Sequence, residues 1–430
     1  MSIQLMFIGL FVFLLLGIPV GFSIGMAVFL GVLVDPNLIS VIVAQKMVDG
    51  INSFALMALP LFILSGGIMV YGSTPRLMNL ANLLLHKKKW GIGNVGVMSC
   101  AAFGTISGSG VATTAAIGSI VAPEMVKKGY GKGFTASIIA AAGTLGTIIP
   151  PSICFVVYAQ IAGCSISDMF LAGIIPGLLA AFLLCILNKY IVRKRNWGTD
   201  DDTHIYENMS QKEKIKIFVD ALAPLFMPII ILGGVLSGVI TATEAAAVAC
   251  IYAVILAVFV YKEMGIKEFF KVMEDSAVGS ATVLIIMGAA SPFAWLLTFS
   301  NTTQKLSNTI FAFSDNVFVV YGIIIVILLI LGFFMETIAT ILMTGPMFIP
   351  IIKSLGVDPV AYGITSCLAL CIGAITPPLA VCLFTSCKIL NMRVEDTFPD
   401  IIWVCGVMLV ATLLTAFFPI LSLFLPMYLN

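Results

Sequence analysis

The sequence predicts an all-α, polytopic membrane protein built from two halves of opposite orientation. The composition is the first observation: 60% of the 430 residues are hydrophobic and only 10% are charged. The mean hydropathy of +1.13 is far above that of soluble domains. Several apolar runs exceed the roughly 18–20 residues that a helix needs to cross a bilayer. These runs do not alternate as the strands of a membrane barrel would, so the spanning elements are predicted to be helices.

The apolar runs, separated by polar breaks, predict about ten transmembrane crossings and two hairpins. The runs are 4–18, 21–34, 52–72, 94–122, 134–162 and 168–190 in the first half, and 217–240, 244–261, 276–299, 317–350, 360–387 and 398–427 in the second. The stretch 4–34 has two interpretations, one long helix or two short ones broken near Pro19. The second half favours the broken form, because its first two runs are separated near Gly238.

Glycines, prolines and small residues recur between the halves with a constant offset of 227 residues. The coinciding pairs are Ala112/Ala339, Thr113/Thr340, Gly118/Gly345, Pro123/Pro350, Gly129/Gly356, Gly146/Gly373, Pro150/Pro377 and Pro151/Pro378. Interrupted hydrophobic segments at corresponding places in two halves are the best sequence pointer to the binding site of a transporter. The repeat therefore predicts a function class as well as a fold.

The distribution of Lys and Arg orients the chain. Of the 22 Lys and Arg residues, only Lys46, Lys305 and Lys353 lie in the loops 35–50, 300–316 and 351–359. The other 19 lie in the remaining loops, which the positive-inside rule places in the cytoplasm. Both flanks of 94–122 are then cytoplasmic and both flanks of 317–350 external, so each run is predicted to be a re-entrant helical hairpin.

The two hairpins enter from opposite faces, which predicts an inverted repeat. The first repeat is 1–192, the second is 217–430, and the charged segment 193–216 is a cytoplasmic linker. Segments 36–50 and 262–275 have amphipathic spacing and charged flanks. They are interpreted as interfacial arm helices, with ordinary loops as the alternative.

Several function classes are excluded by the residues. A net charge of +1 argues against nucleic acid as a partner. The two histidines, His86 and His204, lie in predicted loops, so a Ser-His-Asp arrangement within the membrane is impossible and an enzyme is not expected. The ten cysteines lie mostly in apolar runs without a histidine nearby, as buried packing residues do. The chain has no phosphate-binding loop motif, which leaves an ion gradient as the expected energy source.

The run 143–152 interrupts the predicted helix 134–162, and 373–378 repeats the interruption. Consecutive prolines lack N–H donors, so carbonyl groups one turn earlier lose their helical partners. Irregular backbone at membrane depth is tolerated only where it is buried in protein or lines a cavity, and such carbonyls suit a hard cation such as Na⁺. A plain proline kink is the alternative.

The two predicted hairpin turns face these breaks. Residues 107–110 read Ser-Gly-Ser-Gly and are followed by the hydroxyls of Thr113 and Thr114. The other turn is expected between 335 and 340, and Glu336 is the only Asp, Glu, Lys or Arg in the hairpins and broken helices. An ionisable group at bilayer depth costs about 2.5–3.5 kcal/mol on insertion scales. Glu336 is interpreted either as a charge that helps to hold a cation or as an N-terminal helix cap.

These motifs resemble the large, DctM-like membrane subunit of tripartite ATP-independent periplasmic (TRAP) transporters, within the ion transporter superfamily. The matching motifs are GSGVATTAAIG (108–118), PEM (123–125), GY (129–130), GTLG (143–146), IPPS (149–152), DMFLAGIIPG (168–177), SG (237–238), TEAAAV (243–248), ME (335–336) and TPP (376–378). They cover nearly the whole chain.

The resemblance implies a Na⁺-coupled importer of an organic acid, of the sialic acid or C4-dicarboxylate class, that works by an elevator mechanism. It also implies a small four-helix, DctQ-like membrane subunit, a periplasmic DctP-like substrate-binding protein, and a location in the bacterial inner membrane. A carrier or exchanger of the same superfamily that needs no binding protein is the alternative.

Site residues follow from the same resemblance, where hairpin turns meet unwound helices. One cation site maps to Ser107, Gly108, Ser109 and Gly146, and the other to Thr337, Thr340, Gly373 and Thr376. The second hairpin lacks the Ser-Gly-Ser-Gly turn, which makes its ligands harder to assign. The substrate is expected between the hairpin tips, and the residues predicted to contact it are Thr113, Thr114, Ser152 and Glu336.

Overall fold

The computed structural model describes residues 2–34, 40–85, 90–198, 209–314 and 316–429. Within these ranges every regular element is a helix, as the composition predicts. Three parts of the sequence-based predictions lie outside the described residues: 36–39 of the first arm helix, the lysine run 87–89, and 199–208 of the linker.

The first half contains eleven helical segments in the described residues. They are α1 (Ser2–Leu15), α2 (Val20–Val34), α3 (Ser40–Ile51), η1 (Phe54–Met57), α4 (Ala58–Leu85), α5 (Gly91–Ser107), α6 (Gly110–Lys127), α7 (Lys132–Thr144), η2 (Leu145–Thr147), α8 (Ile153–Ala162) and, preceding the linker, α9 (Ile166–Lys194) as the last and longest. The stretch 4–34 is broken between α1 and α2, which confirms the two-helix interpretation.

The second half follows the same order. Its helices are α11 (Gln211–Leu236), α12 (Ala242–Val254), the π-helical turn η3 (Ile255–Val260), α13 (Ile266–Phe299), α14 (Thr302–Phe313), α15 (Val317–Phe334), α16 (Thr337–Ser354), α17 (Pro359–Gly373), α18 (Val381–Ile389), η4 (Glu395–Thr397), α19 (Asp400–Phe417) and α20 (Ile420–Leu429). Eight helices in the described ranges are long and apolar enough to cross a membrane, and shorter apolar helices accompany them.

The 227-residue offset of the sequence repeat is also the offset of the helices. Helix α6 runs from 110 to 127 and α16 from 337 to 354, so both ends coincide after the shift. The equivalent positions Thr144 and Cys371 touch each other, because the Cys371 thiol lies 3.8 Å from the Thr144 carbonyl oxygen. A residue that contacts its own repeat equivalent lies at the axis that relates two copies, so the two halves meet at the ends of α7 and α17.

The second predicted arm helix differs from the structure. Residues 266–275 are not a separate element but the first turns of the continuous, 34-residue helix α13. In the first half, by contrast, Asn52 and Ser53 separate α3 from the helices that follow. The sequence between 262 and 299 has no paired prolines like those of the interrupted helices, and α13 continues through its single proline, Pro292. Whether either segment lies in the membrane interface stays a prediction.

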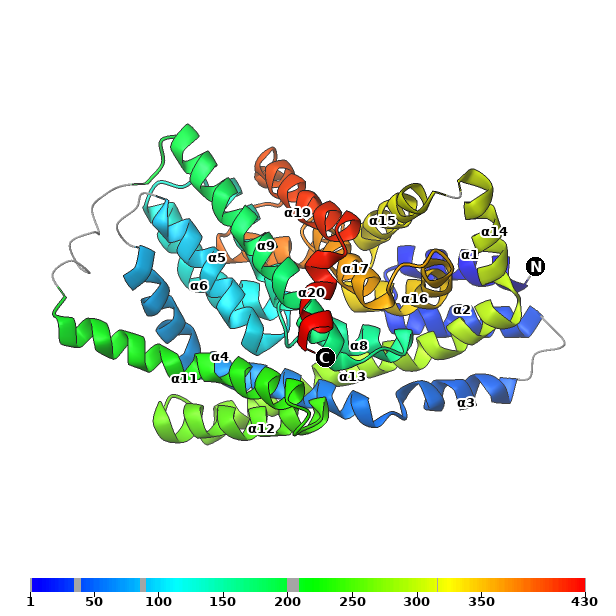
Figure 1. Cartoon of the computed structure of the whole chain (residues 1–430), viewed down its shortest axis with the longest axis horizontal. Helices are drawn as coiled ribbons and strands as arrows, with labels where there is room; N and C mark the ends of the chain where they lie inside the picture. The colour runs from blue at the N-terminus through cyan, green and yellow to red at the C-terminus, as the bar shows by residue number, and fades with distance from the viewer. Residues whose placement is uncertain (1, 35–39, 86–89, 199–208, 315, 430) are drawn as a thin grey trace.

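The helices form two groups (Figure 1). In the scaffold group, α4 packs on α11 and α12, and α13 packs on α2 and α3. In the hairpin group, α5 to α9 and α15 to α20 pack together, for example α6 on α18 and α16 on α8. The groups meet where α4 contacts α5 and where α13 contacts α16.

Two adjacent glycines let α4 approach both neighbours closely. A Cβ atom on Gly66 would lie 2.9 Å from the Cα atom of Ser107, and one on Gly67 would lie 2.9 Å from the side chain of Val272. The backbone of α4 therefore separates the first hairpin from α13 without a side chain at either position.

Further along, α4 is kinked at Tyr71 and Gly72, where Gly72 has a φ of +89°. The guanidinium of Arg76 secures this kink by donating to the Gly72 carbonyl oxygen and to Glu263 at 2.9 Å. It also lies over the Tyr261 ring, 3.6 Å from the centroid. The kink is thereby tied to the segment that follows η3.

Candidate ion and substrate site

The tip of the first hairpin gathers hydroxyl groups. Gly108, whose φ of +60° suits glycine, is the C-cap of α5, and Ser109, whose hydroxyl accepts a hydrogen bond from the Ala112 N–H, is the N-cap of α6. The Ser107 hydroxyl lies 2.7 Å from that of Thr113 and donates to the Ser109 carbonyl oxygen at 3.3 Å. The sequence-predicted residues Ser107, Gly108, Ser109 and Thr113 thus lie in one cluster.

The break between α7 and α8 packs directly against this tip. A Cβ atom on Gly146 would lie 2.5 Å from the Thr113 hydroxyl oxygen and 2.8 Å from the Ser109 carbonyl oxygen. Gly143 has equally little room, because a Cβ atom there would overlap the hydroxyl of Thr114. Only glycine permits such a close approach of the two backbones, so the structure brings together all four residues of the first predicted cation site.

The prolines leave carbonyl groups in the two breaks without their helical N–H donors. Pro150 and Pro151 cannot donate to the carbonyl oxygens of Gly146 and Thr147, and the Ser152 hydroxyl bonds to the second of these at 2.6 Å. In the second half, Pro377 and Pro378 likewise cannot donate to the carbonyl oxygens of Gly373 and Ala374. There the Gly373 carbonyl oxygen accepts from the Thr376 N–H, and that of Ala374 accepts from the Cys382 N–H. The first break therefore retains, at Gly146, a carbonyl group without the usual helical donor.

The second hairpin turns at Met335 and Glu336, and Glu336 is the N-cap of α16. Its carboxylate accepts from the N–H groups of Ile338 at 3.0 Å and Ala339 at 3.3 Å. Ser109 caps α6 at the equivalent position through Ala112, the equivalent of Ala339. Of the two interpretations of Glu336, the structure shows the helix cap, while a role in holding a cation stays a prediction.

The remaining residues of the second predicted cation site are less closely assembled. The Thr340 hydroxyl bonds to the Glu336 carbonyl oxygen, and the Thr376 hydroxyl bonds to the Ile372 carbonyl oxygen. Gly373 packs against Gly332, which lies on α15 three residues before the turn at Met335. Among the described residues no hydrogen bond links Thr337 or Thr340 to Gly373 or Thr376, and the assignment of these four residues to one cation site stays a prediction.

Two predicted substrate contacts have local partners. The Thr114 hydroxyl donates to the Gly110 carbonyl oxygen at 2.9 Å, and Ser152 donates to Thr147 as described above. Both side chains are buried. Their assignment to the substrate stays a prediction, and the structure shows for each a role in holding the hairpin or the break.

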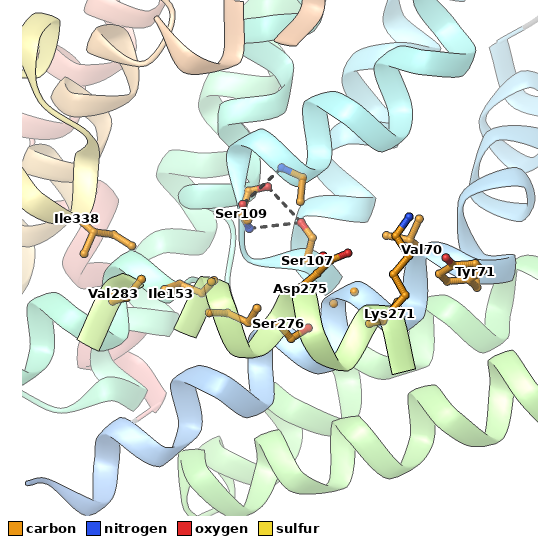
Figure 2. Close-up of a pocket in the computed structure, with 16 residues that line it drawn as sticks. Val70, Tyr71, Ser107, Ser109, Ile153, Lys271, Asp275, Ser276, Val283 and Ile338 are labelled. Atoms are coloured by element: carbon orange, nitrogen blue, oxygen red, sulfur yellow. Dashed lines mark hydrogen bonds between the residues drawn. The ribbon is translucent and has the colours of Figure 1, made fainter. Parts of the chain in front are cut away.

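A cavity of about 510 Å³ separates the hairpin tips from the scaffold group (Figure 2). Ser107, Ser109 and Ala112 line it from the first hairpin, and Ile338 lines it from the second. Both tips therefore border one cavity, and the expectation that the substrate lies between them stays a prediction. The opposite wall is formed by α4 and α13, and its polar members Lys271, Asp275 and Ser276 were missed by sequence reasoning. Their four-residue spacing from 271 to 275 was the available signal, since it places both charges on one helix face.

Two hairpins, two interrupted helices and a shared cavity define a helical membrane transporter. The fold is similar to that of the YdaH transporter of Alcanivorax borkumensis, with a TM-score of 0.59 at 15% identity over 90% of each chain. It is also similar to MtrF of Neisseria gonorrhoeae, with a TM-score of 0.57 at 13% identity over 87% of this chain and 84% of that one.

The sequence identifies the family. The model of the family described as "Tripartite ATP-independent periplasmic transporter, DctM component" matches residues 7–421. The chain belongs to this family of TRAP transporter large permeases. It is therefore a transport protein and not an enzyme.

Relatives within the family have different named substrates. The chain is 34% identical to the C4-dicarboxylate TRAP transporter large permease DctM of Pseudomonas aeruginosa, over 90% of both chains. It is 32% identical to the sialic acid permease SiaM of Vibrio cholerae, over 95% of both. It is 35% identical to the isethionate permease DctMQ of Oleidesulfovibrio alaskensis over 96% of its own length, but spans only 64% of that longer protein.

Proposed function

We propose that this chain is the large permease of a Na⁺-coupled TRAP importer that carries an organic acid across the bacterial inner membrane. The observation that carries the proposal is the junction of the first hairpin tip with the break at Gly146. Hydroxyl oxygens of Ser107 and Thr113 and the carbonyl oxygen of Ser109 converge there. Hard cations take oxygen ligands of this kind, and Na⁺ is the common one that drives secondary transport.

The organic acid is proposed from the cavity and from the relatives. The cavity between the hairpin tips has the size of a small-molecule site, and the N-terminus of α6 begins at its edge with Ser109. The N-terminus of α16 is already capped by the Glu336 carboxylate, so only the N-terminus of α6 supports this argument. Helix N-termini favour anions. Three relatives are named for isethionate, sialic acid and C4-dicarboxylates, all of which are organic anions. The sialic acid or C4-dicarboxylate class is the proposed substrate.

An elevator movement is proposed from the two helix groups. The bare backbone of α4 at Gly66 faces Ser107 of the hairpin group, and small residues let helices pass closely. The hairpin group would then carry substrate and Na⁺ past the scaffold group. Family membership further supports two partners, a small DctQ-like membrane subunit and a periplasmic DctP-like binding protein.

Reconstitution tests the proposal. The large and small permeases are placed in proteoliposomes, the purified binding protein is added outside, and uptake of labelled sialic acid and of succinate is measured with an inward Na⁺ gradient. We expect uptake of one of the two acids that needs both Na⁺ and the binding protein. Replacement of Na⁺ by K⁺ without loss of uptake would refute the coupling ion. Uptake without the binding protein would instead indicate a partner-independent carrier.

A further inference from the structure

The cavity has a charged wall that belongs to the scaffold group. Of the described residues that line it, only Lys271 and Asp275 carry charge. Both project from α13 on the side where the first hairpin tip lies (Figure 2). Residues 271, 275, 279 and 283 all line the cavity, which is the spacing of one helix face. One face of α13 therefore forms the wall.

Neither charge is neutralised by a partner. No ion pair among the described residues includes Lys271 or Asp275, and both side chains are exposed. Charged groups within a membrane protein are costly unless they face water or a partner. Because both residues line the cavity, the two charges can act on whatever occupies that space.

We propose that Lys271 and Asp275 form a charge-selective lining of the route between the hairpin tips and the cytoplasm. Lys271 attracts the anionic substrate, and Asp275, one turn further along α13, attracts the cation that leaves the cluster of Ser107 and Ser109. The opposite signs suit a carrier that releases an anion and Na⁺ together, so this inference rests on the proposed function. The side is set by the positive charges around 262–275, which assign the start of α13 to the cytoplasm.

The lining can be tested without a substrate. Ala112 lies at the hairpin tip, lines the cavity and is partly exposed, so Ala112→Cys places a thiol opposite α13. The thiol is reacted, from the cytoplasmic side of membrane vesicles, with anionic sulfonatoethyl methanethiosulfonate and with cationic trimethylammonioethyl methanethiosulfonate. The protein without the added thiol gives the background from native cysteines. Val283→Cys, in the same cavity, is the second reporter if Ala112→Cys does not fold.

The measured quantity is the ratio of the anionic to the cationic reaction rate. Lys271→Gln should lower this ratio about three- to tenfold, and Asp275→Asn should raise it by a similar factor, as expected for a unit charge at short range in a wet cavity. Lys267→Gln is the matched control, because it removes a charge from the same helix outside the cavity. A ratio that neither Lys271→Gln nor Asp275→Asn changes, or that Lys267→Gln changes equally, would overturn the inference.

The same variants separate this inference from the proposed function. If the reaction ratios shift as expected but reconstituted wild-type protein shows no Na⁺-driven uptake of an organic acid, the lining stands and the proposed function fails. If uptake is Na⁺-driven but the ratios do not shift, the proposed function stands and the lining fails.

Discussion

Replacement of Gly146 by alanine is the most direct test of the first cation site. The added Cβ atom would lie 2.5 Å from the Thr113 hydroxyl oxygen, whereas ordinary contacts begin near 3.4 Å, so the hairpin tip must retreat by about 0.9 Å. Overpacking of this kind costs about 1–3 kcal/mol. If the cost falls on the Na⁺-bound arrangement, the apparent Na⁺ affinity decreases about 5- to 150-fold.

The assay is thermal unfolding of the purified permease over a Na⁺ titration, with ionic strength held constant by choline. The half-saturating Na⁺ concentration of Gly146→Ala is compared with that of wild type and of Gly322→Ala. Gly322 is the matched control, because it is a helical glycine of the second hairpin with no heavy atom within 4 Å of an added Cβ. Gly146→Ala protein that folds and binds Na⁺ with wild-type affinity would refute the assignment of Gly146 to a cation site.

Three further substitutions test other parts of the site and scaffold. Gly373→Ala should weaken Na⁺-driven uptake and lower thermal stability together, because its Cβ would overlap the Gly332 carbonyl; uptake equal to wild type would contradict this. Glu336→Gln keeps an acceptor for the N–H groups of α16 and loses only the charge–dipole contribution, about 0.3–1 kcal/mol. We expect its unfolding temperature to change slightly, and a large fall in Na⁺ affinity would instead assign the charge to the cation. Arg76→Lys should destabilise the fold by about 1–2 kcal/mol in chemical unfolding, because lysine cannot keep both the hydrogen bonds and the stacking on Tyr261; an unchanged midpoint would show that the kink does not need the guanidinium.

Much of the fold could be predicted because the repeated positions include prolines, which restrict the backbone. Pro150, Pro151 and their equivalents cannot continue a helix, so the breaks after α7 and α17 lie where the sequence placed them. The residues of the first predicted cation site, Ser107, Gly108, Ser109 and Gly146, were named from the family resemblance. The structure brings them together because glycine alone suits the φ of +60° at Gly108 and the lack of room at Gly146, while the binding of a cation there stays a prediction. The predicted hairpin 94–122 is shorter than the observed 91–127, because α5 starts with glycines and α6 ends with Glu124 and Lys127, which interrupt the apolar run.

The cavity wall was not predictable from the sequence. Lys271 and Asp275 have the pattern of charges at a membrane surface, and that pattern is identical whether the helix faces lipid head groups, solvent or a cavity. Whether this helix face lines a cavity depends on how α13 packs against α4, for example at Gly67 and Val272. The sequence does not reveal a contact between segments so far apart. Glu336 illustrates the same limit. A lone carboxylate in an apolar run does not show from the sequence that it accepts hydrogen bonds from two backbone N–H groups of α16.

The contact between Thr144 and Cys371 supplies a built-in reference point for measuring motion. Both residues belong to helices of the hairpin group, and each is the repeat equivalent of the other. A rigid displacement of that group would leave their separation unchanged, while distances from either residue to α4 or α13 would lengthen or shorten. Spectroscopic labels near 144 and 371 should therefore keep a constant distance from each other. Their distances to a third label on Val283 would change only if the hairpin group moves relative to α13.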